Sequence, residues 1–134
     1  MFDFIGWEKQ EGLITMKGPK RLDHKIGFRN HTNGHGSDIT ISSDLIKEVG
    51  AKRFDLFRRR DVYALVPNNN GNLYIGKDQN RLSGIGLYAI TEIATTCGIT
   101  MTTNVQHIDG IVRNGAIIFP AENYFNNGWK EEKA

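Results

Sequence analysis

Three consecutive arginines, Arg58-Arg59-Arg60, are the residues of this sequence best suited to hold an anion. The planar guanidinium group pairs with two oxygens of a phosphate at once. Because side chains alternate along a strand, Arg58 and Arg60 should point one way and Arg59 the other. At most two of them then form one patch, with Lys52 and Arg53 close in sequence. Such phosphate contacts fix affinity and its salt dependence without selecting a base sequence.

Histidine and acidic side chains gather in a second segment, from His24 to Asp38. His31 and His35 stand four residues apart, a spacing at which a helix can present two ligands to a metal ion. The glycine-containing spacer favours a loop instead, and no third ligand follows from the spacing. We therefore expect no metal or nuclease site here, only loop histidines that face solvent or a phosphate.

The sequence "GIGLYA", residues 84–89, matches the glycine pattern of dinucleotide-binding loops. That motif needs a preceding strand and a βαβ unit, and neither is predicted, so the segment is interpreted as the start of a helix. No Ser-His-Asp set, Cys-His set or pair of carboxylates at a defined spacing stands out. We predict a non-enzymatic protein with no catalytic residue, metal or cofactor.

The basic residues are unevenly distributed along the chain. Residues 17–60 hold eleven Lys and Arg against five acidic residues, a balance of +6, whereas the whole chain carries +2. A basic first part on a mildly acidic remainder is typical of a protein that meets a polyanion with one face. A well-solvated surface without such a partner explains the same distribution.

The chain of 134 residues has the length of one domain and a globular composition, 39% hydrophobic and 24% charged. No run approaches the roughly 18 apolar residues of a membrane span. The N-terminus lacks the basic start and apolar core of a signal peptide. A single cysteine, Cys97, excludes an internal disulfide, and its place on an apolar helical stripe predicts a core residue. We expect a cytoplasmic protein.

Hydrophobic periodicity and turn residues divide this single domain (residues 1–134) into blocks. Residues 1–25 look irregular, with a possible strand at 12–16. Residues 26–77 form a β-rich block with one short helix, residues 82–120 form a helix and a β-hairpin, and a tail follows at 126–134. We expect an α+β fold of mostly antiparallel strands with two short helices.

Capping residues and turn residues place the elements of these blocks. Ser42 or Ser43 can accept a free N–H of the first helix, Asp44 suits the positive end of its dipole, and Gly50 is a natural stop. An apolar stripe that begins at Leu87 predicts the second helix, and Asn114-Gly115 predicts the turn of the hairpin. The strands expected in the β-rich block are residues 25–29, 38–42, 54–58, 62–67 and 72–76.

The segment "GSDITISSDLIKEVGAKRFDLFRRRDVYALVP" resembles the swapped-hairpin domain of AbrB-type transition-state regulators and related antitoxins. Leu45, Val49 and Gly50 match the family's short helix and its stop, within a resemblance that covers about residues 25–77. It implies two chains that interleave hairpins into one barrel-like homodimer, with DNA across basic hinge loops. Lys47 stands where the family is often basic, whereas Asp38 stands where it tends to have a basic residue.

The wider layout also looks like that of small early proteins of phages that infect Gram-positive bacteria, which implies a regulatory or host-directed role. We expect a DNA-binding regulator built as an AbrB-like barrel with a helix and hairpin extension. The alternative is a protein-binding inhibitor or adaptor that contacts a host protein through Phe2, Phe4, Trp7 and Trp129. The residues predicted to contact nucleic acid are Arg29, His31, Asn33, His35, Lys47, Lys52, Arg53, Arg58, Arg59 and Arg60.

Overall fold

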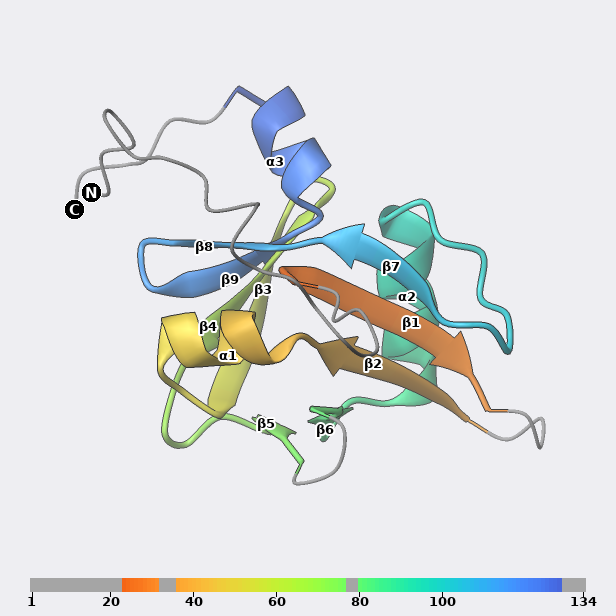
Figure 1. The fold of residues 1–134 in the computed structure, drawn as a ribbon, viewed down its shortest axis with the longest axis horizontal. Helices are drawn as coiled ribbons and strands as arrows, with labels where there is room; N and C mark the ends of the chain where they lie inside the picture. Colours follow the sequence, from red (N-terminus) through yellow and green to blue (C-terminus); the bar gives the residue numbers. More distant parts are fainter. Residues whose placement is uncertain (1–22, 32–35, 77–79, 129–134) are drawn as a thin grey trace, which may run out of the picture.

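The computed structural model describes residues 23–31, 36–76 and 80–128, which form an α+β fold of mostly antiparallel strands (Figure 1). The three-stranded sheet has the order β2 (Ser37–Ile41), β1 (Lys25–Asn30) and β7 (Gln106–Asp109). The six-stranded sheet has the order β6 (Leu82–Ser83), β5 (Leu73–Ile75), β3 (Arg53–Arg59), β4 (Val62–Pro67), β9 (Ala116–Phe119) and β8 (Ile111–Arg113). The helices are α1 (Ser43–Val49), α2 (Leu87–Thr96) and α3 (Ala121–Asn126).

Strands β1 and β2 form an antiparallel hairpin whose apolar side chains face the core. Ile26 lies opposite Ile41 and Phe28 lies opposite Ile39, and all four side chains are buried. A Cβ atom on Gly27 would lie 2.5 Å from the Thr40 hydroxyl, so only glycine lets the two strands approach as they do. β7 pairs with the other side of β1 and completes the small sheet.

Helix α1 forms where its capping residues predict it, between the two pairs of strands. Gly50 ends it in the left-handed region at a φ of 69°, and its N–H donates to the Ile46 carbonyl. The expected cap by the Ser42 hydroxyl is wrong. That oxygen instead accepts the Lys25 N–H and donates to the Asp44 carboxylate.

Both predicted hairpins form in the larger sheet. Asn114 and Gly115 join β8 to β9 with φ angles of 51° and 77°, as an Asn-Gly turn requires. The turn between β3 and β4 is shorter than the segment Arg-Arg-Arg-Asp suggests. It comprises only Arg60 and Asp61, because Arg59 already pairs with Val62.

The core fills the space between the two sheets and α2. Its largest fully buried side chains are Phe28, Phe54 and Phe119, one from the small sheet and two from the large one. Ile90 and Ile93 of α2 pack on the same cluster. None of the helices among the described residues is long and apolar enough to cross a membrane.

Two parts of the expected fold are wrong. The strands form two sheets rather than a closed barrel, although β7 leads into β8 through Gly110 and an isolated bridge joins Thr40 to Arg81. The described residues contain three helices rather than two, because α3 follows β9 directly in a segment without an apolar stripe long enough to predict it. The possible strand at 12–16 lies outside the described residues.

Candidate nucleic-acid interface

Helix α1 is bordered by two pockets that together form what we call the α1 groove. One, of about 530 Å³, has Lys25, Asp44 and His107 in its lining, and the other, of about 660 Å³, has Lys52 in its lining. The pockets share three residues, which makes them one continuous surface. The shared residues are Ser43, Lys47 and Asn80.

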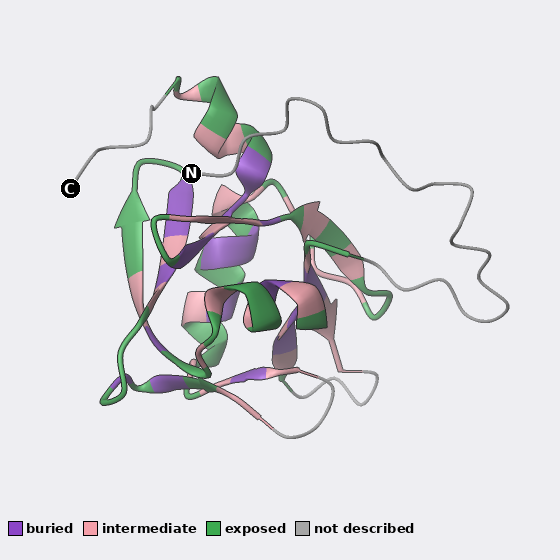
Figure 2. Cartoon of the chain, turned by 60° about the vertical axis from the view of Figure 1, so that its left-hand side comes forward, coloured by how far each residue is buried: buried purple, intermediate pink, exposed green. Residues whose placement is uncertain are grey.

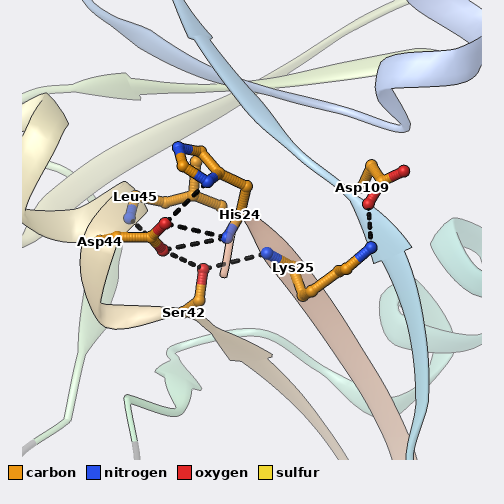
Figure 3. Close-up of polar contacts among 6 residues, drawn as sticks. All are labelled: His24, Lys25, Ser42, Asp44, Leu45 and Asp109. Carbon is orange, nitrogen blue, oxygen red and sulfur yellow. Dashed lines mark hydrogen bonds and ion pairs between the residues drawn. The ribbon is translucent and has the colours of Figure 1, made fainter. Parts of the chain in front are cut away.

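A cluster of hydrogen bonds around the Asp44 carboxylate fixes α1 against the start of β1 (Figure 3). The carboxylate accepts the Ser42 hydroxyl at 2.6 Å, the His24 N–H at 3.0 Å and the Leu45 N–H at 2.9 Å. The His24 ring nitrogen Nδ1 lies 2.8 Å from the other carboxylate oxygen. His24 adopts a φ of 54°, a strained value for a residue with a side chain, and these bonds hold it there.

The charge of Asp44 is stabilised by this cluster. Partial burial raises the pKa of Asp44, but the hydrogen bonds from Ser42 and from the His24 and Leu45 backbone, with the His24 charge, bring it below its usual value. The carboxylate lies between the serine and the histidine, whereas a nucleophilic triad needs the histidine between the other two. The cluster is therefore suited to positioning α1 and not to activating Ser42.

The opposite wall of the groove contains a surface ion pair and a histidine. The Lys25 ammonium pairs with the Asp109 carboxylate on β7, as Figure 3 shows. Burial lowers the pKa of His107, and the nearby charge of Lys25 lowers it further. His107 is therefore neutral at physiological pH and can contribute hydrogen bonds, but little charge, to the groove.

Lys47 and Lys52 supply the positive charge of the groove. Both are exposed, and neither forms an ion pair within the part of the chain that the structure describes. Lys47 is one turn along α1 from Ser43, so the two side chains share one face of the helix. Lys52 follows the end of the helix and lines the second pocket. The groove therefore presents two cations that have no acidic partner among residues 23–31, 36–76 and 80–128.

Arg29 and His31, by contrast, surround a buried acid in what we call the Asp38 cluster. The Asp38 side chain is 6% exposed, and its Oδ2 atom lies 2.8 Å from His31 Nε2 and 3.3 Å from Arg29 Nη2. Arg81 completes the cluster, with its buried Nε atom 3.4 Å from Oδ1. The pairing follows from register, since Arg29 lies directly opposite Asp38. These basic side chains share one counterion within the protein.

The residues around the β3–β4 turn, Arg58 to Asp61, form the arginine turn, and its side chains contact the helices. Arg58 lies 3.3 Å from the Glu92 carboxylate on α2, lies over the Tyr63 ring and donates to the Arg60 carbonyl at 2.7 Å. Asn127, just after α3, bonds to both Arg60 and Asp61. Arg59 also has a contact of its own.

The predicted contact residues do not come together on one face. Arg53 and Arg59 stand at opposite ends of β3, roughly 20 Å apart at the rise of a strand. Arg29 lies toward the end of β1 that is away from α1, in a pocket that shares Gly27, Thr40 and His107 with the first pocket of the α1 groove. Asn33 and His35 lie outside the described residues, as do the four terminal aromatic residues of the alternative. Of the predicted residues that the structure describes, Lys47 and Lys52 line the α1 groove, and Arg53 follows Lys52 in the chain.

Arg53 has local contacts but keeps its charge near the α1 groove. Its Nη1 atom donates to the Gly71 carbonyl at 2.9 Å, and its guanidinium lies 5.0 Å from the centre of the Tyr74 ring. Neither partner is acidic, so the arginine still contributes a positive field beside Lys52. Arg53 therefore belongs with the two lysines, and not with the arginine turn at the other end of its strand.

Two residues of the groove have no signal in the sequence. Asn80 donates to the Ser43 hydroxyl at 2.6 Å, and its carbonyl accepts the Ile41 N–H, so it joins the end of β2 to the start of α1. His107 reaches the groove through the pairing of β7 with β1. Both contacts join segments more than thirty-five residues apart, and no local pattern encodes them.

The free thiol of Cys97 and a metal centre are two other kinds of site that could carry chemistry. Burial raises the pKa of the Cys97 thiol to about 12, with Arg58 lowering it and Asp61 raising it, so the thiol is unreactive at neutral pH. Residues 23–31, 36–76 and 80–128 contain no group of three His, Cys, Asp or Glu side chains that could hold a metal ion. Comparison with protein-family models, with curated proteins and with solved structures finds no match.

Proposed function

We propose that this protein is a small non-enzymatic DNA-binding regulator that holds the phosphate backbone with the α1 groove. The observation that carries the proposal is the pair of lysines, Lys47 and Lys52, that line the groove without an acidic partner among the described residues. Unpaired cations release counterions when a polyanion binds, and this release supplies most of the affinity of non-specific DNA binding.

The neighbours of the two lysines suit a phosphate. Arg53 adds positive charge, and the hydroxyl of Ser43 and the amide of Asn80 can both donate hydrogen bonds. Contacts of this kind orient a protein on the duplex without reading its sequence. Two acids line the groove, Asp23 and Asp44, and Asp44 is bonded to Ser42 and His24.

The order of elements supports a relationship to AbrB-type domains. Between Lys25 and Pro67 the chain forms the strands β1 and β2, the short helix α1 at its expected position, and the strands β3 and β4. We propose that this block is an AbrB-like domain, that the protein is a homodimer and that it acts in the cytoplasm.

The test is fluorescence anisotropy with a random-sequence DNA duplex across a salt series. Replacing Lys47 and Lys52 with Gln should weaken binding by about tenfold or more and reduce the salt slope by about two. A charge-matched control replaces Arg58 and Arg60 with Gln and should leave the slope unchanged. Equal losses in both variants, or a greater loss in the arginine variant, would reject the α1 groove as the interface.

A protein-binding inhibitor or adaptor is the second candidate. The observation that favours it is the exposure of Phe57, Leu87 and Tyr88, of which Tyr88 is 91% exposed. Exposed aromatic residues often dominate protein interfaces. If the anisotropy stays flat at low salt, the regulator is excluded, and affinity capture with a Tyr88→Ala variant as the control becomes the test of this candidate.

A further inference from the structure

Strand β3 leaves one of its edges open over most of its length. β4 pairs with β3 as far as Arg59, whereas β5 pairs with it only at Arg53 and Phe54. Along the part of the chain that the structure describes, no strand adjoins residues 55–59 on the side of β5. Figure 2 shows this part of β3 as the green arrow at the left-hand margin, beside the buried start of β4.

The phase of the ladder decides which backbone groups face this open edge. In an antiparallel sheet a residue directs its N–H and C=O to one neighbouring strand, and the next residue directs them to the other. The Asn68 N–H donates to the Arg53 carbonyl at 3.0 Å, and the Ile75 N–H donates to the Lys52 carbonyl at 2.8 Å. Odd-numbered residues of β3 therefore bond toward β4, and even-numbered residues bond toward the side of β5.

The even-numbered residues of β3 that β5 does not reach are Leu56 and Arg58. Their backbone N–H and C=O groups have no hydrogen-bond partner among the described residues. Between them stands Phe57, whose side chain is 56% exposed. A groove of about 520 Å³ lies beside the edge, and its other wall is the start of α2 with the segment before it. Unpaired backbone groups beside an exposed aromatic side chain form a template for another strand.

We propose that the strand added here is β3 of a second copy of the chain, antiparallel to the first, with Phe57 on the twofold axis. Leu56 of each copy then lies opposite Arg58 of the other. The four backbone groups at this edge bond to the same four groups of the second copy, as an isologous interface requires. The two larger sheets become one continuous sheet.

The neighbouring registers of the two β3 strands are excluded. An axis at Leu56 would set Arg58 opposite Phe54, whose edge groups β5 already occupies. An axis at Arg58 would set two arginines directly opposite each other and would pair Leu56 with Arg60, which belongs to the turn. Moving the axis by half a residue spacing would pair Leu56 of one copy with Phe57 of the other. The backbone groups of Phe57 point toward β4 and not toward the open edge, so no ladder could form.

The side chains of the outer face also fit this register. With Phe57 on the axis, Asp55 of each copy lies opposite Arg59 of the other, so opposite charges flank the centre on both sides. The two Phe57 rings form a cross-strand pair at the position where side chains of facing strands approach most closely. Self-complementary charge around an aromatic centre favours a second copy over an unrelated peptide as the occupant.

Disulfide formation tests the register directly. At a pair on the axis the two Cα atoms lie about 4.5 Å apart, within the range of a disulfide. In a Cys97→Ala background, Phe57→Cys should form a covalent dimer on mild oxidation at least about tenfold faster than Phe125→Cys. Phe125 is the matched control because it has the same 56% exposure and lies on α3. Equal rates for the two variants would overturn the proposal.

Light scattering after gel filtration tests the dimer itself. The wild-type chain should have twice the monomer mass of 15.1 kDa, and Phe57→Lys should shift it to the monomer at the same concentration. Phe125→Lys should remain dimeric. A monomeric wild type would overturn the proposal, and so would a dimer that survives Phe57→Lys, because that dimer would use another surface, such as exchanged hairpins.

Discussion

The Asp38 cluster and the α1 groove both gather basic side chains, but they differ in where the nearest acid lies. In the Asp38 cluster a buried carboxylate contacts Arg29, His31 and Arg81. In the groove Lys25 pairs with Asp109 and Asp44 is bonded to His24 and to its own helix, whereas Lys47 and Lys52 have no ion-pair partner among the described residues. The number of basic residues in a segment therefore says less about polyanion binding than the place of the nearest acid does.

The largest effect should come from removing the counterion of the Asp38 cluster. Asp38→Asn leaves its cations uncompensated around a buried site, so we expect the free energy of unfolding to fall by about 3 kcal/mol. The matched control is Asp109→Asn, which breaks an exposed ion pair and should cost less than about 1 kcal/mol. Urea unfolding measures both, and equal losses would show that the cluster is not a structural centre.

The sequence predicted most elements because local signals encode them. Gly50 ends α1 and Asn114-Gly115 turns β8 into β9, each through backbone angles that these residues favour. The charge of a segment is equally visible in the sequence. What it does not contain is pairing in space, so Asp38 was identified as a departure from a family pattern and not as the partner of Arg81, which lies forty-three residues further along the chain.

One part of the candidate site was predicted from the sequence and another part was not. Lys47 was predicted from the resemblance to AbrB-type domains, and Lys52 from its place in sequence near the three arginines. Asn80 and His107 reach the groove only through the packing of β2 and the pairing of β7 with β1. Backbone strain was missed at Arg60, whose φ of 56° is unusual for arginine and follows from the tight connection of β3 to β4.

A smaller, pH-dependent effect should come from the acid of the α1 groove. The pKa of Asp44 is lower in the folded protein than the usual 3.8, so its bonds stabilise the fold at neutral pH. This contribution is present above pH 3.8 and is lost as the pH falls through the lowered folded pKa. Asp44→Asn should cost about 1 kcal/mol at pH 7 and much less near pH 2. Urea unfolding at the two pH values measures this difference, and an equal cost at both would contradict it.

The smallest effect should come from Arg60→Gly in the arginine turn. Glycine relieves about 1 kcal/mol of left-handed strain, but it adds a similar entropy to the unfolded chain and removes one exposed hydrogen bond to Asn127. We therefore expect the free energy of unfolding to change by less than about 0.5 kcal/mol. The affinity for a DNA duplex should change less than about twofold, because the loss of one charge remote from the α1 groove is screened by salt. A loss as large as that of the lysine variant would mean that the arginine turn, despite its contacts with the helices, is the surface that meets the phosphate backbone.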